Sequence, residues 1–250
     1  FAGIDVTGAG MALDIDGGRV FYIGSNTVQV ANMDGTGTPY ELGDGTGDPY
    51  DVALDIPNEK VYAISEGEEK IYTLTMNGGA SQTPTDLYDL SAFDECYSLT
   101  LDLENRLIYF VDDDGATGGI YQISMDSPTP GSATAVYTWS VPNSPRGIKY
   151  NSTDGRLYWA DYTRGIIASV KTDGTDEKIL VSGESPWYLA VRNSGDIFWT
   201  RYNVGEIHRS RNLSTYGRFA VLINSSSAPL HLTYLSSSVI GINAGFGGAT

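Results

Sequence analysis

Aromatic and polar side chains recur at two adjacent positions of a unit that occurs six times in this chain, and their types suit ligand binding. In the six copies, the first of these positions is Ala9, Tyr50, Tyr97, Arg146, Trp187 and Leu230, and the second is Gly10, Asp51, Ser98, Gly147, Tyr188 and His231. Aromatic rings offer a large contact area at a small entropy cost, and a few polar groups among them orient a ligand. We therefore predict a binding site formed by Tyr50, Asp51, Tyr97, Arg146, Trp187, Tyr188 and His231.

Residues for nucleophilic or acid–base catalysis are scarce. The chain has two histidines: we expect His208 on the surface of a strand, and no Ser–His–Asp pattern surrounds His231. The one cysteine, Cys96, can form no internal disulfide and is expected to be a buried, small apolar residue. The interpretation that this chain is not an enzyme is favoured, and no catalytic residue is assigned.

Two acidic loops could hold calcium through their oxygen atoms. These are Asp112–Gly115 and Asp44–Asp48, and neither matches an EF-hand loop. A solvated turn is the alternative for both loops, so calcium is a possible cofactor without an assigned ligand set.

The chain is strongly acidic, with a net charge of −16. Nucleic-acid binding is disfavoured because it depends on Lys and Arg that neutralise phosphates. The charge is also uneven: residues 1–145 carry −19 and residues 146–250 carry +3. A solvated acidic surface, a cation site, a basic partner and head-to-tail self-association are all consistent with this distribution.

Three N-x-S/T sequons are expected in loops, where a glycan could be attached without disturbing a core. Their acceptor residues are Asn151, Asn212 and Asn224. Together they favour a secreted, extracellular glycoprotein. The chain starts with Phe1 rather than Met, as expected of a processed chain.

The candidate residues owe their common position to a repeated unit of 41–49 residues. The first apolar run of each unit ends at Asp14, Asp55, Asp102, Asn151, Arg192 or Leu235. Six residues earlier, four of the six copies have a proline, which suits the start of a strand because proline cannot donate to a ladder. Repetition at this period indicates an array of equivalent sheets.

Each unit contains four short apolar or alternating segments, which predict four strands. In the clearest copy they are 148–151, 157–161, 166–172 and 177–181. We predict an all-β, six-bladed β-propeller of four-stranded blades, a single domain over 1–250 with blades that start near 9, 50, 97, 146, 187 and 230. The sixth unit lacks its last strands, so we expect residues 1–7 to add the outer strand of that blade. No run of 18 apolar residues would span a membrane.

In a propeller, the loops before the inner strands meet at the mouth of the central channel. This arrangement would gather the seven candidate residues into one lip. The alternative is that some of these rings only plug the channel.

The second strand of the units carries a motif that resembles the YWTD repeat of low-density-lipoprotein-receptor-type six-bladed propellers. The motif is written LYWAD at 157–161, with LIYFVD at 107–112 and IFWTR at 197–201, and its aromatic pairs are Tyr109 and Phe110, Tyr158 and Trp159, Phe198 and Trp199. The resemblance implies that these rings pack between blades and that Asp112 and Asp161 tie the structure together.

From the resemblance and the lip we expect a secreted recognition module that binds an extracellular protein or glycan. Two other classes stay open: a calcium-dependent hydrolase of the lactonase type, and a structural or adhesive matrix protein.

Overall fold

The computed structural model describes residues 10–24, 26–43, 47–114, 118–141, 143–210, 219–224, 229–234 and 240–244, with side chains up to Ser210 except that of Tyr202. The described residues form β-strands joined by turns, with two short 3-10 helices, η1 (Ile56–Asn58) and η2 (Tyr202–Val204). No helix in these ranges has the length and hydrophobicity that a membrane crossing requires.

Five antiparallel four-stranded sheets, the blades, are present in the described residues, each with its strands in sequence order. Blade 1 has β1 (Met11–Asp14), β2 (Arg19–Gly24), β3 (Thr27–Asn32) and β4 (Tyr40–Glu41). Blade 2 has β5 (Pro49–Asp55), β6 (Lys60–Ser65), β7 (Lys70–Thr75) and β8 (Thr85–Asp89). Blade 3 has β9 (Leu99–Asp102), β10 (Leu107–Asp112), β11 (Gly119–Ser124) and β12 (Thr134–Thr138). Blade 4 has β13 (Pro145–Asn151), β14 (Arg156–Asp161), β15 (Ile166–Lys171) and β16 (Lys178–Ser182). Blade 5 has β17 (Pro186–Val191), β18 (Ile197–Arg201), β19 (Glu206–Ser210) and β20 (Phe219–Asn224).

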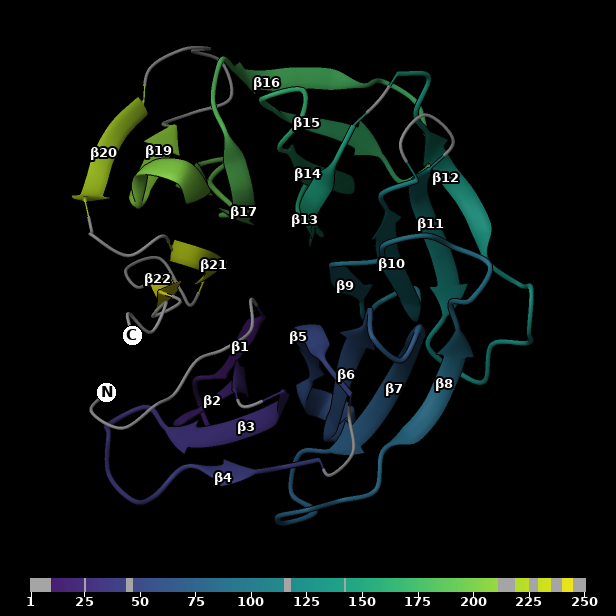
Figure 1. Ribbon diagram of the computed structural model, residues 1–250, viewed down its shortest axis with the longest axis vertical. Helices are drawn as coiled ribbons and strands as arrows, with labels where there is room; N and C mark the ends of the chain where they lie inside the picture. Colours follow the sequence, from purple (N-terminus) through teal and green to yellow (C-terminus); the bar gives the residue numbers. More distant parts are fainter. Residues whose placement is uncertain are drawn as a thin grey trace.

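The blades stand around a common axis, with the first strand of each blade innermost (Figure 1). A two-stranded sheet of β21 (Pro229–Tyr234) and β22 (Ile240–Ala244) contacts both β17 and β1, so the ring returns to its first blade. The β-propeller is therefore confirmed, but the prediction of six four-stranded blades is corrected to five within the described residues. Only the inner pair of strands is described where a sixth blade was expected. The expected strand at 1–7 lies outside the described residues.

The hydrophobic core lies between successive blades. Adjacent side chains on a strand point to opposite faces, so the aromatic pair of each second strand serves two interfaces. Phe110 packs with residues of blade 2, whereas Tyr109 packs with residues of blade 4. Trp159 faces blade 3 and Tyr158 faces blade 5, and both are fully buried. These rings thus have the core role that the motif implied.

Buried aspartates fix the turns at both ends of the inner strands. Asp161 Oδ1 accepts hydrogen bonds from the amides of Ser144 and Arg164, and so joins the segment before β13 to the turn after β14. At the other end, Asp102 accepts the amides of Glu104 and Asn105. The ring therefore has two faces that we name by these ends: the proline face, where β5, β13 and β17 start, and the aspartate face, where β1, β5 and β9 end.

Candidate functional site

The residue after the repeated proline lies in a β-bulge, which explains why it projects from the sheet. In blade 4, Pro145 pairs with Asp161 and Gly147 with Ala160, so Arg146 between them has no partner in the ladder. Tyr50 is bypassed in the same way in blade 2, and both Trp187 and Tyr188 are bypassed in blade 5. A bulge leaves one residue unpaired and redirects its side chain. The repeat thus places Tyr50, Arg146 and Trp187 together on the proline face.

These residues form a continuous stack around the Arg146 guanidinium. Its Cζ lies 4.1 Å from the ring centroid of Tyr97 and 4.9 Å from that of Trp187. The Tyr50 ring extends the stack, at 4.7 Å from the Tyr97 ring. Each Arg–ring contact is a cation–π interaction, and together they hold the guanidinium in one orientation. The structure therefore brings four of the predicted residues into one cluster, which we call the lip stack: Tyr50, Tyr97, Arg146 and Trp187.

Two residues outside the predicted lip complete this cluster: Tyr162 was not singled out from the sequence, and Asp113 was considered only as part of an acidic loop. Tyr162, directly after the LYWAD motif, contacts the Trp187 ring edge-on at 5.2 Å. Asp113 Oδ2 lies 3.3 Å from Arg146 Nη2 and accepts a hydrogen bond from Ser144 Oγ at 2.9 Å. The signal for both was positional, because each follows the motif aspartate of its own blade and so lies in a turn on the proline face.

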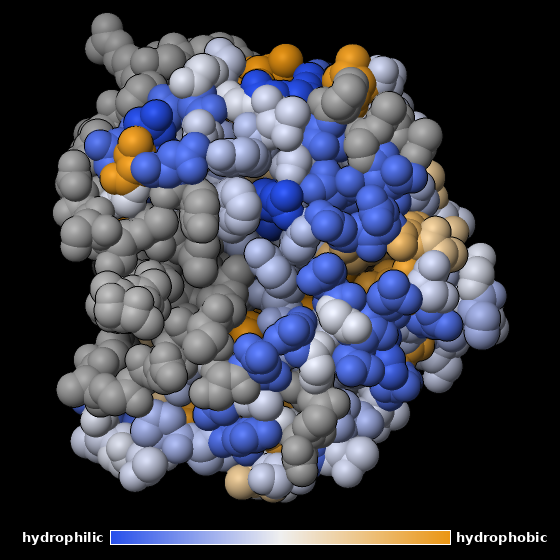
Figure 2. All heavy atoms as spheres, in the orientation of Figure 1, coloured by the Kyte–Doolittle hydropathy of each residue, from blue (hydrophilic) through white to orange (hydrophobic). Residues whose placement is uncertain are grey.

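Acidic groups surround the lip stack on the side of blades 2 and 3. Burial raises the pKa of Asp113 to about 6, against the lowering effects of Ser144 and Arg146. The pKa of Glu66 is also raised, first by burial and then by Glu95 and Asp48. Figure 2 shows hydrophilic residues gathered over blades 2 and 3 on the face that it presents. A ligand at the stack therefore meets a negative field beside a fixed cation.

Two of the predicted lip residues are fully buried inside the ring, and Tyr97 itself is only 8% exposed. Asp51 is fully buried, and its carboxylate accepts hydrogen bonds from Ser98 Oγ at 2.6 Å and Val52 N at 2.9 Å. Ser98 Oγ in turn accepts the amide of Ile148, so Asp51 links blades 2, 3 and 4. The hydrogen bonds from Ser98 and Val52 give Asp51 a structural role, and we therefore no longer expect Asp51 to contact a ligand.

Tyr188 is the ring that plugs the channel. It is fully buried, and its hydroxyl donates to the Tyr97 carbonyl at 3.1 Å. Since Tyr188 belongs to blade 5 and Tyr97 to blade 3, the side chain reaches past the start of blade 4. Gly147 permits this path, because a Cβ there would lie 3.0 Å from Tyr188 Cδ1. Tyr188 therefore supports the lip stack from below and does not reach a ligand.

The remaining candidates have varied outcomes. Asn151, expected in a loop, is the last residue of β13; it is 5% exposed, and its Oδ1 accepts a hydrogen bond from Thr153 N. Glycosylation at Asn151 stays a prediction. The side chains of His231, Asn212 and Asn224 lie outside the described residues.

The expectation of a surface His208 is wrong, since His208 is 1% exposed with Nε2 2.7 Å from Glu206 Oε2. Cys96 is buried as expected, and burial raises the pKa of its thiol.

No group of three potential metal ligands is brought together within the described ranges. In the first acidic loop, Asp112 Oδ1 accepts the amide of Asp94, and Asp113 pairs with Arg146. In the second loop, residues 44–46 lie outside the described ranges. The Asp112 and Asp113 carboxylates of the first loop are thus engaged by groups of the protein itself.

Comparison by sequence finds only a partial likeness. No family model matches the chain. It is 32% identical over 126 residues to Protein cueball of Drosophila sechellia, which covers 48% of this chain and 19% of that protein. Protein cueball of Drosophila grimshawi is 28% identical over 127 residues, covering 48% of this chain and 20% of that protein. The chain spans about a fifth of the length of these curated relatives.

Comparison by structure finds propellers of diverse kinds. The structure of a nidogen/laminin complex contains a chain with a TM-score of 0.77 and 19% identity, covering 90% of this chain and 85% of that one. A gluconolactonase, XC5397 of Xanthomonas campestris, has a TM-score of 0.77 at 16% identity, covering 96% of this chain and 84% of the other. Virginiamycin B lyase of Staphylococcus aureus has a TM-score of 0.69 at 17% identity, covering 97% and 93%. These identities show the propeller fold alone, which hosts both binding proteins and enzymes.

Proposed function

We propose that this propeller is a recognition module that binds an extracellular protein through its proline face. The observation that carries the proposal is the lip stack, in which Arg146 lies between the rings of Tyr97 and Trp187. Arg, Tyr and Trp dominate the energetic centres of protein–protein interfaces. The nidogen/laminin neighbour supports a protein partner, as does the resemblance to the YWTD repeat.

A glycan ligand is less well supported than a protein. Sugars bind aromatic residues by stacking on an open ring face, but Arg146 occupies one face of Tyr97 and one of Trp187. Of the three rings, Tyr50 and Trp187 are half-buried and so retain exposed surface for a partner. The hydrolase alternative has no metal-binding group among the described residues to support it.

The acidic groups beside the stack point to the charge of the partner. Glu66, Glu95 and Asp113 lie close enough to influence one another or Arg146. A partner with a basic segment next to an apolar or carboxylate anchor would satisfy both parts of the surface. Electrostatic complementarity of this kind raises the association rate and selects among partners.

The proposal is tested by affinity capture from native extracellular fluid with quantitative mass spectrometry. Immobilised wild-type protein is compared with Trp187→Ala, and with Tyr40→Ala as a matched control, since Tyr40 is an exposed aromatic on β4. We expect a partner that is retained by wild type and Tyr40→Ala and reduced at least tenfold with Trp187→Ala. Equal retention by all three proteins would refute the lip stack as the binding site.

The same experiment separates the two ligand classes. If the partner is a protein, capture survives enzymatic removal of glycans from the fluid and is lost after protease treatment. Loss of capture after glycan removal alone would assign the surface to carbohydrate instead.

A further inference from the structure

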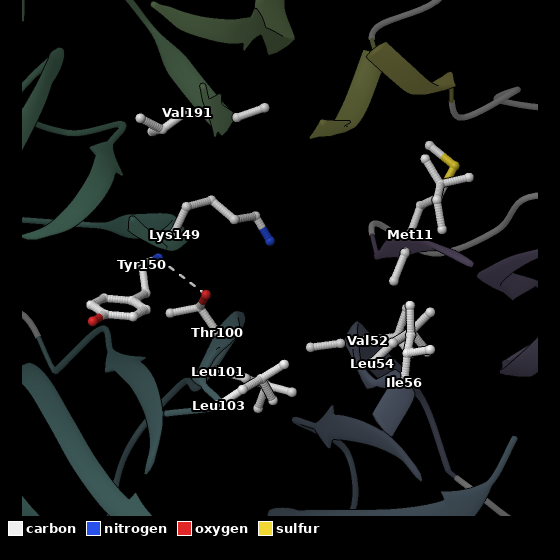
Figure 3. A pocket seen from close by; sticks show the side chains of 14 residues that line it. Met11, Val52, Leu54, Ile56, Thr100, Leu101, Leu103, Lys149, Tyr150 and Val191 are labelled. Atoms are coloured by element: carbon white, nitrogen blue, oxygen red, sulfur yellow. Dashed lines mark hydrogen bonds between the residues drawn. The ribbon is translucent and has the colours of Figure 1, made fainter. Parts of the chain in front are cut away.

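A cavity opens in the central channel at the aspartate face, away from the lip stack. Its volume is about 280 Å³, and five inner strands contribute to its wall (Figure 3). Most of the described lining residues are apolar in type, with Met11, Val52, Leu54, Leu101 and Val191 among them, while polar atoms contribute at least as much of the exposed wall as apolar atoms do. A concave site that combines apolar side chains with polar groups has the usual character of a small-molecule pocket.

One cation stands in this apolar wall. Lys149, on β13, points its ammonium nitrogen into the space between the inner strands (Figure 3). Its described charged neighbour is Asp51 Oδ2 at 3.9 Å, which is too long for a hydrogen bond. Asp51 accepts hydrogen bonds from Ser98 and Val52, so its pairing with Lys149 is a longer-range charge interaction that leaves the ammonium hydrogen atoms for another acceptor. The ammonium is therefore placed to donate to a group that enters the cavity.

The two ends of the channel differ. Toward the proline face, the buried Tyr188 side chain extends from blade 5 to the Tyr97 carbonyl of blade 3. At the aspartate face, the residue after the terminal aspartate is an exposed apolar one in three successive blades: Ile15, Ile56 and Leu103, which are 47%, 45% and 40% exposed. Ile56 and Leu103 also line the cavity. Exposed apolar side chains grouped at a cavity mark a binding surface more often than scattered ones. A ligand thus enters through an apolar rim and meets the cation inside.

We propose that this cavity binds a short aliphatic carboxylate, with the acid group hydrogen-bonded to Lys149 Nζ and the chain against the leucine and valine side chains of the wall. A charge-assisted hydrogen bond inside an apolar site is stronger than a neutral one, so the acid is selected over an alcohol of the same length. An amine is rejected because its charge would face Lys149. The site lies on the face opposite the lip stack and is independent of the proposed protein recognition.

Isothermal titration calorimetry with octanoate, octanol and octylamine tests the proposal. We expect saturable one-to-one binding of octanoate to wild type, weaker binding of octanol and none of octylamine. Lys149→Met is expected to weaken octanoate binding at least tenfold. Lys171→Met is the matched control, because Lys171 is exposed at the end of β15. The affinity of the Lys171→Met variant for octanoate is expected within twofold of that of wild type. Absence of saturable octanoate binding, or equal affinity in both variants, would overturn the proposal.

A second pair of variants decides the matter if Lys149→Met does not fold. Leu103→Glu adds a negative charge to the rim at an exposed position, and Val204→Glu adds one at a similarly exposed position in η2, on the proline face. We expect octanoate affinity to fall at least threefold with Leu103→Glu and to stay unchanged with Val204→Glu. Equal affinities in this pair would place the ligand elsewhere.

Discussion

Arg146 is the residue on which the candidate site depends most. Its guanidinium contacts two rings and a carboxylate, and all four groups come from different blades or turns. A binding surface that is rigid before its ligand arrives loses less entropy on binding than a flexible one. The stack therefore contributes to the stability of the proline face as well as to recognition.

Replacing Arg146 by Lys tests this double role, because Lys keeps the charge but not the planar group that stacks on rings. We expect Arg146→Lys to lower the free energy of unfolding by about 1–2 kcal/mol, from two cation–π contacts. Arg164→Lys is the control, since the two ion pairs of Arg164 are long, at 3.9 Å each. Urea denaturation measures both, and equal losses in the two variants would argue against the stack.

Asp113 should titrate near pH 6, since burial raises its pKa to about 6. A raised pKa means that the folded state holds the proton more tightly than the unfolded chain. The contribution of protonated Asp113 to the stability of the folded state is thus fully present below about pH 4, and it is lost as the pH rises through 6. NMR of the carboxyl carbons measures this, with exposed Asp173, whose pKa is lowered by hydrogen bonds from Thr175, as the reference. Titration of Asp113 together with Asp173 would contradict the buried environment.

At the scale of elements, charged bridges join neighbouring blades on the aspartate face. Arg106 Nη1 lies 2.5 Å from Asp55 Oδ2 in blade 2, while its Nη2 lies 2.8 Å from Asp126 Oδ1 in its own blade. Asp55 is 1% exposed, so this carboxylate depends on its partners for stabilisation. The register of these strands is thus linked to a specific ion pair as well as to apolar packing.

Arg106→Leu is expected to destabilise the protein by about 3 kcal/mol, because it leaves a buried carboxylate without its cation. The matched control is Lys178→Leu. The ion-pair partner of Lys178 is Asp176, which is 40% exposed, so removing this pair should lower the free energy of unfolding by less than about 1 kcal/mol. Chemical denaturation compares the two. A loss below 1 kcal/mol for Arg106→Leu would show that the bridge contributes little.

The elements also show how far the sequence could predict the site. The repeated proline predicted where inner strands start, and β5, β13 and β17 do begin at Pro49, Pro145 and Pro186. The bulges that follow these prolines were not predicted. The burial of Asp51 and Tyr188 could not be predicted, since it depends on side-chain contacts between different repeats. The burial of His208 was missed for a similar reason: Glu206 lies beside it, and Glu184 from the preceding unit lies 3.6 Å from its Nδ1.

On the scale of the whole molecule, the ring separates two surfaces of different chemistry. The proline face combines aromatic residues, one stacked cation and an acidic surround, whereas the aspartate face has an apolar rim around a channel with one lysine. Tyr188 lies between the two sites. The repeat predicted the ring, but the number of four-stranded blades in the described residues is five, with β21 and β22 completing the circle.

Closure by β21 and β22 should be essential to the ring. A chain that ends after Asn224 loses both strands and uncovers β17 and β1, which β21 contacts. Uncovered inner strands favour association between chains, so we expect a lower melting temperature and concentration-dependent oligomers. A chain that ends after Ala244 is the control. Light scattering and thermal unfolding make the comparison, and two identical monomeric chains would mean that closure is dispensable.

Hydrogen–deuterium exchange of the protein alone and with its captured partner tests the central claim most directly. We predict slower exchange in segments 47–50, 95–98, 143–147 and 184–188, which carry or flank the lip stack, and unchanged exchange at Ile15, Ile56 and Leu103. Protection confined to the aspartate face, or spread along the outer strands β4, β8, β12 and β16, would contradict recognition through the lip stack.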